Sequence, residues 1–201
     1  MMEWTAFEDQ ARTEGYTCIC GIDEAGRGPL AGPVYAAAVV LRPGQVSEGF
    51  NDSKKLGEKK REALFDTICS QCAAYGIGSA TEKEIDEINI LNATYLAMQR
   101  AVAALPVQPD CALVDGNRAP DLPLEVRTII KGDAQSASIA AASILTKVSR
   151  DRYMLQMAEK YPQYAFEKHK GYGTKLHYER LEQYGISPIH RLSFLKKWMN
   201  R

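Results

Sequence analysis

One short stretch near the amino end constrains this chain more than any other. Residues 18–34 read CICGIDEAGRGPLAGPV: β-prone residues lead to two adjacent carboxylates, Asp23 and Glu24, which are followed directly by a loop too rich in glycine to be a helix or a strand. Residues 34–41, VYAAAVVL, predict a second and largely buried strand. Neighbouring carboxylates repel each other, so a folded protein keeps them together most readily where a cation lies between them or water solvates both. The stretch therefore predicts a strand that delivers paired acids to a functional site.

The loop after the acids holds Gly26 and Gly28 on either side of Arg27. Because glycine has no Cβ, the backbone around Arg27 is free to take positive φ and to approach a ligand closely. An Asp-Glu pair or a Gly-x-Gly sequence alone is common on ordinary solvated loops, and only the combination points to a site. We expect this loop to recognise the shape of a ligand through its peptide groups.

Length and composition favour a single domain over residues 1–201. The 25 basic residues balance the 25 acidic ones, and no apolar run is long enough to span a membrane. The amino end has no signal-peptide pattern, so we expect a cytoplasmic protein, and a monomer is the default expectation. The odd number of cysteines, 5, favours reduced thiols, and the pair Cys69 and Cys72 on a predicted helix does not form a convincing zinc motif.

The balanced net charge hides an asymmetry along the chain. Residues 147–201 contain 12 Lys and Arg against 5 Asp and Glu, whereas the remainder contains 13 against 20. A basic region beside an acidic one suits an enzyme that uses cations to act on a polyanion, although a solvated basic helix is the simpler alternative.

Two further segments carry an acid to the end of a predicted strand. Residues 111–115, CALVD, end in Asp115, and residues 124–130, LEVRTII, end shortly before Asp133. A long helix over about 134–161 begins with small residues, which predicts that it packs very close to other elements. Asp133 alone suits the N-cap of that helix, but its place as the third acid in the series favours the site. If these strands are neighbours in one sheet, the acids converge on one patch.

The donor set of this patch indicates its chemistry. Asp23, Glu24, Asp115 and Asp133 offer only hard carboxylate oxygens, which suit Mg²⁺ or Mn²⁺ better than zinc. Four acids could hold two such ions, an arrangement that activates water and stabilises the leaving oxygen in phosphodiester hydrolysis. Basic side chains of the carboxyl-terminal region would then hold the nucleic-acid backbone. The residues themselves therefore predict a metal-dependent nuclease.

Seven motifs together resemble bacterial type 2 ribonuclease H, the ribonuclease HII family. They span most of the chain in the family's order, and as a set they are highly specific. They are GIDEAGRGPLAGPV at 21–34, DSKKL at 52–56, VDGN at 114–117, KGDAQSASIAAASI at 131–144, KVSRD at 147–151, HKGYGT at 169–174 and PIHRLSF at 188–194.

The resemblance implies an α/β fold: a ribonuclease H-like mixed β-sheet flanked by helices, with a core over about 16–161 and a small C-terminal helical extension over about 162–201. It implies that the four acids are the metal-binding and catalytic carboxylates. It also implies that Gly26, Arg27 and Gly28 grip the 2′-hydroxyl of a ribonucleotide, with Tyr172 as the stacking residue at the RNA–DNA junction. The implied reaction is cleavage 5′ to a ribonucleotide in duplex DNA or in an RNA/DNA hybrid, leaving 3′-hydroxyl and 5′-phosphate ends. Such an enzyme removes misincorporated ribonucleotides and RNA primers.

Other side chains are less specific candidates. Lys54, Lys55 and Lys147 suit phosphate contacts, but an exposed lysine is as often merely solvated. His169 suits a proton relay or simple attraction of phosphate, and His190 suits a turn. Tyr172 by itself is either an exposed platform or a core residue, and the resemblance favours the platform.

Three other interpretations remain open from the residues. Another nuclease or transposase of the ribonuclease H-like superfamily would share the acids but not the loop around Arg27 or Tyr172. A catalytically silent nucleic-acid-binding module would bind in a salt-dependent way without turnover. A metal-dependent phosphatase acting on small molecules would have no use for the basic region.

Overall fold

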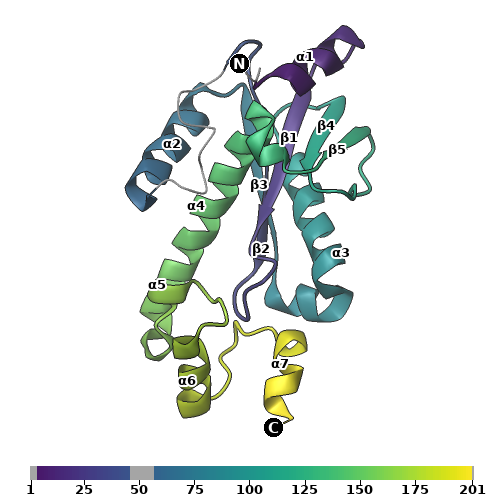
Figure 1. Ribbon diagram of the computed structural model, residues 1–201. Helices are drawn as coiled ribbons and strands as arrows, with labels where there is room; N and C mark the ends of the chain where they lie inside the picture. The colour runs from purple at the N-terminus through teal and green to yellow at the C-terminus, as the bar shows by residue number, and fades with distance from the viewer. Residues whose placement is uncertain (1–3, 46–56, 201) are drawn as a thin grey trace.

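The computed structural model describes residues 4–45 and 57–200. It forms one five-stranded sheet with helices on both faces (Figure 1), which confirms the predicted mixed sheet flanked by helices. The strands lie in the order β3-β2-β1-β4-β5. They are β1 (Ile19–Ala25), β2 (Val34–Val40), β3 (Ala74–Ala80), β4 (Cys111–Asp115) and β5 (Glu125–Ile129).

Strand direction divides the sheet at β1. β2 runs antiparallel to β1 and to β3, as expected for chain that turns back on itself, whereas β4 and β5 run parallel to β1. The parallel register pairs Ile22 with Val114, so the next residues along the two strands, Asp23 and Asp115, lie at the same edge of the sheet. Convergence of these acids, which the sequence predicted conditionally, follows from this register.

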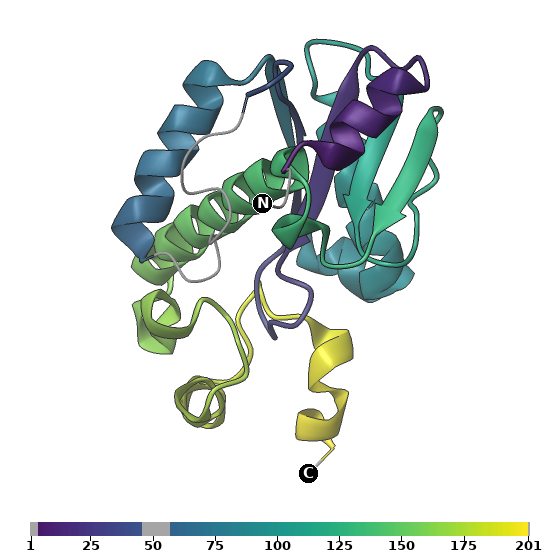
Figure 2. The ribbon, with the colours of Figure 1, turned by 45° about the horizontal axis from the view of Figure 1, so that its top comes forward.

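Long helices cover the two faces of the sheet. α3 packs on one face and α4 on the other, and α2 lies beside α4 (Figures 1 and 2). Apolar side chains of the strands alternate between the two layers because successive residues of a strand point to opposite faces. The helices are α1 (Ala6–Thr13), α2 (Glu58–Gln71), α3 (Glu82–Ala103), α4 (Ala137–Lys160), α5 (Phe166–His169), α6 (Lys175–Tyr184) and α7 (Leu192–Met199), with the short 3-10 turns η2 (Gly132–Ala134) and η3 (Pro162–Tyr164).

The start of α4 lies directly against β1. A Cβ on Gly21 would come within 2.2 Å of the backbone of Ser138, so the two elements are in backbone contact at this point. This close approach agrees with the small residues at the start of the helix. Buried Glu8 of α1 holds the same region, because its Oε1 accepts hydrogen bonds from the hydroxyls of Ser136 and Ser138, both at 2.6 Å.

The long helix begins later than predicted. Ser136 is its N-cap, with its hydroxyl accepting from the Ile139 N–H at 3.2 Å, and residues 132–134 form η2 instead. Asp133 therefore does not cap the helix, and the capping alternative weighed for it from sequence is wrong.

The segments after α4 pack against the glycine-rich loop that follows β1. Leu30 and Ala31 of that loop share one apolar cluster with Phe166, Leu181 and Ile189. Figure 1 shows α5, α6 and α7 gathered at the end of the molecule toward which β1 runs. Among the described residues, no helix has the length and apolar character needed to cross a membrane.

Candidate active site

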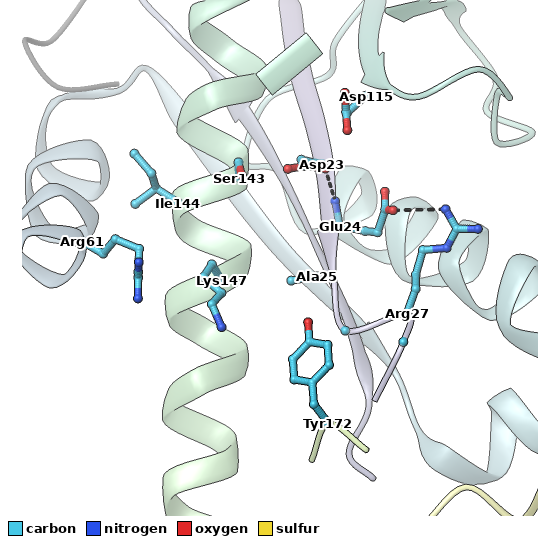
Figure 3. A pocket seen from close by; sticks show the side chains of 12 residues that line it. Asp23, Glu24, Ala25, Arg27, Arg61, Asp115, Ser143, Ile144, Lys147 and Tyr172 are labelled. Atoms are coloured by element: carbon cyan, nitrogen blue, oxygen red, sulfur yellow. Dashed lines mark hydrogen bonds and ion pairs between the residues drawn. The ribbon is translucent and has the colours of Figure 1, made fainter. Parts of the chain in front are cut away.

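A cleft of about 400 Å³ opens where β1 and β4 end (Figure 3). Side chains and backbone from β1, the loop after β1, β4, α2, α4 and the loop before α6 contribute to it. It is lined by Asp23, Glu24, Ala25, Gly26, Arg27, Gly28, Arg61, Asp115, Ser143, Ile144, Lys147 and Tyr172.

Three predicted acids lie in this cleft. Asp23 is only 5% exposed; its Oδ1 accepts from the Glu24 N–H at 2.8 Å, and Ser143 of α4 lines the cleft beside it. On the neighbouring strand, Oδ1 of Asp115 accepts from the Gly132 N–H at 2.6 Å. Donors from two separate elements thus hold two of the carboxylates in place.

The electrostatics of these acids indicate a cation site. Burial, followed by the charges of Glu24 and Asp115, raises the pKa of Asp23 well above its ordinary value. Burial also raises the pKa of Glu24, although the Arg27 guanidinium, 3.4 Å from its Oε1, works in the opposite direction. Crowded carboxylates of this kind are stabilised as anions when a divalent cation binds between them.

The donor set fits hard divalent cations in an open site. Its carboxylates offer only oxygen, the donor that Mg²⁺ and Mn²⁺ prefer. Within the described ranges, no three or more carboxylate, imidazole or thiolate groups are placed so that they could hold a metal ion by themselves. Mg²⁺ usually keeps several waters and binds through one or two carboxylates plus substrate phosphate, so such a cage is not required.

Asp133 occupies a different position from the other three acids. It lies in η2, directly after Gly132, whose N–H holds Asp115, but it is not among the residues that line the cleft. The structure thus brings Asp23, Glu24 and Asp115 together and leaves Asp133 beside them.

The two glycines of the loop differ in their surroundings. Gly26 has φ +97°, and a Cβ there would lie 2.2 Å from Nε of Arg150. Gly28 does not have positive φ, and a Cβ on it would meet only the Tyr172 ring, at 3.8 Å. The expectation of a left-handed backbone around Arg27 therefore holds on one side only.

Two buried arginines hold this loop from beneath. Arg191 donates from Nε to the carbonyl of Gly32 at 2.8 Å and from its two terminal nitrogens to the carbonyls of Arg27 at 3.0 Å and Gly26 at 2.6 Å. Arg150 of α4 likewise donates to backbone carbonyls, those of Pro33 at 3.2 Å, Ala31 at 3.1 Å and Lys170 at 3.0 Å.

Neither guanidinium forms an ion pair with a carboxylate in the part of the chain described. Burial, followed by the charge of Arg150, lowers the pKa of Arg191 to about 9. These two members of the basic carboxyl-terminal region therefore shape the loop and are not exposed for a polyanion, which corrects part of the sequence-based interpretation of that region.

Tyr172 stands opposite this loop. It is 45% exposed, and Figure 3 shows its hydroxyl directed toward the strand end that carries the acids, which excludes the core alternative. The guanidinium carbon of Arg150 lies 5.8 Å from the centre of its ring, a distance at which a cation and an aromatic face attract each other. Tyr172 is therefore positioned by the same buried arginine that holds the loop.

Basic side chains from two helices complete the cleft. Lys147 of α4 pairs with Asp151 through a 2.7 Å contact on the same helix, and Arg61 projects from α2 on the facing side (Figure 3). Lys54 and Lys55 lie outside the described residues.

Comparison with known proteins agrees with this geometry. The family model for ribonuclease HII matches residues 20–197. The chain belongs to the ribonuclease HII family. A ribonuclease HII of Caldicellulosiruptor bescii is 58% identical over 189 residues, covering 94% of this chain and 92% of the relative.

Solved structures show the same fold. The ribonuclease H2 of Pyrococcus horikoshii superposes with a TM-score of 0.74 at 29% identity, covering 88% of this chain and 93% of that one. A ribonuclease HIII designated Bst, solved in complex with Mn²⁺, is similar in fold alone, with a TM-score of 0.66 at 17% identity and coverage of 87% and 65%. As a ribonuclease HII, the chain is an endoribonuclease of the ribonuclease H type, and its substrates are RNA/DNA hybrids.

Sequence reasoning about this ribonuclease HII missed several residues and misplaced one. His169 is buried against Tyr164 and Gly171 rather than in the cleft, so the proton-relay interpretation is wrong. Ser143 lies within the quoted motif at 131–144 and Arg61 lies within none, and neither was singled out, because serine on a small-residue helix and arginine on an exposed helix are ordinary. Arg150 and Arg191 lie within two of the quoted motifs, yet nothing in the sequence distinguishes a buried arginine from an exposed one.

Proposed function

We propose that this chain hydrolyses the phosphodiester on the 5′ side of a ribonucleotide, either embedded in duplex DNA or within an RNA/DNA hybrid. The products would be 3′-hydroxyl and 5′-phosphate ends, and the reaction would serve to remove misincorporated ribonucleotides and RNA primers. The observation that supports this proposal is that Asp23, Glu24 and Asp115 share one cleft with the loop around Arg27 and with Tyr172. The proposed cation ligands and the groups proposed to contact ribose therefore line the same cleft.

The acids would hold two divalent cations, Mg²⁺ or Mn²⁺, with Asp133 contributing from its position beside Asp115. Bound there, the cations would activate a water molecule for attack on phosphorus and stabilise the charge on the leaving oxygen. The ribonuclease HIII of similar fold was itself solved with Mn²⁺. The hydrogen bonds from the Glu24 N–H to Asp23 and from the Gly132 N–H to Asp115 would keep the carboxylates oriented before the cations arrive.

The loop would select ribose through its peptide groups. The carbonyls of Gly26 and Arg27 are held by Arg191, whereas no hydrogen bond among the described residues uses the N–H groups of Arg27 or Gly28. Only the 2′-hydroxyl separates RNA from DNA locally, and it both donates and accepts hydrogen bonds, so fixed peptide groups at close range can recognise it. Tyr172 would stack on the adjoining sugar or base, and Lys147 and Lys54 would contact phosphate.

The experiment uses a labelled DNA duplex with one embedded ribonucleotide, incubated with the protein and Mg²⁺ or Mn²⁺. An all-DNA duplex, an EDTA reaction and the Asp23→Asn variant are the controls. We expect one cut on the 5′ side of the ribonucleotide, with a 3′ end that a DNA polymerase extends and a 5′ end that a phosphatase can dephosphorylate. A long RNA/DNA hybrid, tested in parallel, measures the preference between the two substrates.

Two results would overturn the proposal. Equal cutting of both duplexes would identify a general nuclease that does not read ribose. Salt-dependent binding without any metal-dependent cut would identify a silent nucleic-acid-binding module.

A further inference from the structure

The chain has 3 histidines, and all of them meet in one buried cluster away from the acids. The rings of His169 and His177 are stacked, with centres 4.3 Å apart, and Nε2 of His177 lies 2.9 Å from Nε2 of His190. Residues 169, 177 and 190 come from α5, α6 and the segment before α7. The proposed reaction uses none of these side chains, so the cluster needs its own explanation.

Hydrogen bonding fixes the proton on each ring of the pair. Nδ1 of His177 lies 2.9 Å from the Tyr172 carbonyl oxygen, which can only accept, so Nδ1 carries the proton. Nε2 of a neutral His177 is then an acceptor, and Nε2 of His190 must donate to it. Nδ1 of His190 is left as the acceptor because the Ser187 N–H, 2.9 Å away, can only donate, and the Ser187 hydroxyl, 2.7 Å away, then donates to the same nitrogen.

His169 is fixed by the same reasoning. Its Nε2 lies 3.0 Å from the Tyr164 carbonyl oxygen and must donate, and its Nδ1 accepts from the Gly171 N–H at 3.2 Å. All three rings are therefore neutral, with every ring nitrogen paired. An added proton would replace an acceptor with a donor and place it against another N–H.

The histidine pair forms a continuous chain of hydrogen bonds, which we name the histidine relay: Ser187 N–H to His190, His190 to His177, and His177 to the Tyr172 carbonyl. The residue after His190 is Arg191, which holds the carbonyls of Gly26 and Arg27. One short segment, residues 187–191, thus acts on both groups that are proposed to contact the ribonucleotide, the loop around Arg27 and Tyr172. Through Arg191 it holds the loop, and through the relay it holds the backbone of Tyr172.

We propose that His177 and His190 are positioning residues for the ribonucleotide: the neutral relay sets the place of Tyr172 relative to the loop around Arg27. The proposal rests on the proposed function, because it assumes that substrate contacts Tyr172. The relay acts on the Tyr172 carbonyl and not on its ring, so its effect on catalysis passes through the position of the ring. Neither histidine touches the reacting atoms.

The first test measures the relay without any substrate. Nuclear magnetic resonance of the ring nitrogens at pH 7 should show three neutral imidazoles, with the proton on Nδ1 of His177 and on Nε2 of His169 and His190. A charged ring, or His177 protonated on Nε2, would overturn the relay.

The second test uses a matched pair of variants at His177. In His177→Asn the amide nitrogen takes the place of Nδ1 and can still donate to the Tyr172 carbonyl, whereas His177→Gln reaches the place of Nε2 and cannot. We expect His177→Gln to lower kcat/KM on the single-ribonucleotide duplex by about tenfold, the scale of one lost stacking contact, and His177→Asn to restore most of the loss. Denaturant unfolding of both variants checks that they remain folded at the assay temperature.

Combination with Tyr172→Ala separates positioning from general destabilisation. If the relay acts through the Tyr172 ring, His177→Gln should change kcat/KM less than twofold once that ring is absent. A loss that multiplies with that of Tyr172→Ala would show that His177 is merely structural and would overturn the proposal.

Failure of the relay and failure of the proposed function give different results. Wrong tautomers in a protein that cuts the ribonucleotide duplex normally would refute the relay alone. Correct tautomers in a wild-type protein that makes no such cut would refute the proposed function and, with it, the positioning role.

Discussion

Two groups of charged side chains adjoin the loop that follows β1, and they have opposite character. At the strand ends, Asp23, Glu24 and Asp115 crowd together, and their proximity and burial raise the pKa of Asp23. Beneath the adjoining loop, Arg150 and Arg191 are buried more completely, yet each donates three hydrogen bonds to backbone carbonyls. Carbonyls of the fold hold the charges of the arginines, whereas the charges of the acids repel one another.

This difference separates a site from its support. A buried charge without compensation is costly, and a protein that keeps one does so where a ligand supplies the opposite charge. A buried charge whose donors all find carbonyls instead fixes the backbone that carries those carbonyls. Burial of charge alone therefore does not identify function, and the partners of the charged group have to be examined.

The largest effect on cleavage is expected for Asp23→Asn. The substitution removes the most crowded carboxylate, so cleavage should fall by about a thousandfold or more if this acid holds a catalytic cation. Without divalent cations the same variant should be more stable than the wild type by about 1–2 kcal/mol, because a repelling charge has gone. Single-turnover cleavage and urea unfolding in EDTA measure the two effects.

Addition of Mg²⁺ supplies the control for Asp23→Asn. The cation should raise the unfolding midpoint of the wild type and should raise that of the variant much less. A variant less stable than the wild type in EDTA would show that Asp23 serves the fold and would remove the contrast between the two groups of charge.

Arg191→Lys tests the other side of the comparison. A lysine ammonium cannot reach the carbonyls of Gly26, Arg27 and Gly32 together, so we expect a loss of about 2–4 kcal/mol in the free energy of unfolding. Arg27→Lys is the matched control: its side chain is 52% exposed and forms only a 3.4 Å contact with Glu24, so stability should change by less than about 0.5 kcal/mol. Equal losses would mean that burial of Arg191 contributes nothing beyond an ordinary surface arginine.

The contrast also explains what could be predicted from the sequence. Asp23, Glu24 and Asp115 were found because an acid at the end of an apolar strand is visible in a linear pattern, and parallel neighbours bring such ends together. Arg150 and Arg191 were missed because five of their six partners are carbonyls more than a hundred residues away, which leave no trace in residue type. The N-cap of α4 is Ser136 and not Asp133. The Ser136 hydroxyl donates to the carboxylate of Glu8, and a contact between residues so far apart in sequence cannot be predicted from the pattern around the helix start.

The pH dependence of stability should have opposite signs in two regions. Burial is the largest cause that lowers the pKa of His177 and of His190 from 6.5 to about 4. Below pH 6.5 the unfolded chain binds protons that the folded rings do not, so stability should fall from pH 6.5 toward 4, by on the order of 2–3 kcal/mol for each ring. Asp23, whose pKa is raised, works the other way, since acidification neutralises it in the fold first.

Urea unfolding between pH 7 and 5 of Asp23→Asn, with and without His177→Asn, isolates the histidine contribution. Removal of His177 should reduce the loss in the free energy of unfolding between pH 7 and pH 5. An unchanged slope would indicate that the histidine relay is charged in the folded protein.

The smallest predicted effect is that of alanine substitution at Gly28, and its comparison with Gly26→Ala separates a role in stability from a role in ribose recognition. Gly26→Ala combines positive φ with a clash at the buried Arg150 side chain, so it should lower stability and cleavage together. Gly28→Ala has neither problem, and its methyl group would lie 3.8 Å from the Tyr172 ring, within the cleft. We expect an unfolding free energy within about 0.5 kcal/mol of the wild type and a roughly tenfold loss of kcat/KM on the ribonucleotide duplex. If Gly28→Ala cleaves normally, the loop does not approach ribose at this position, and Gly26 is important only because Arg150 packs against it.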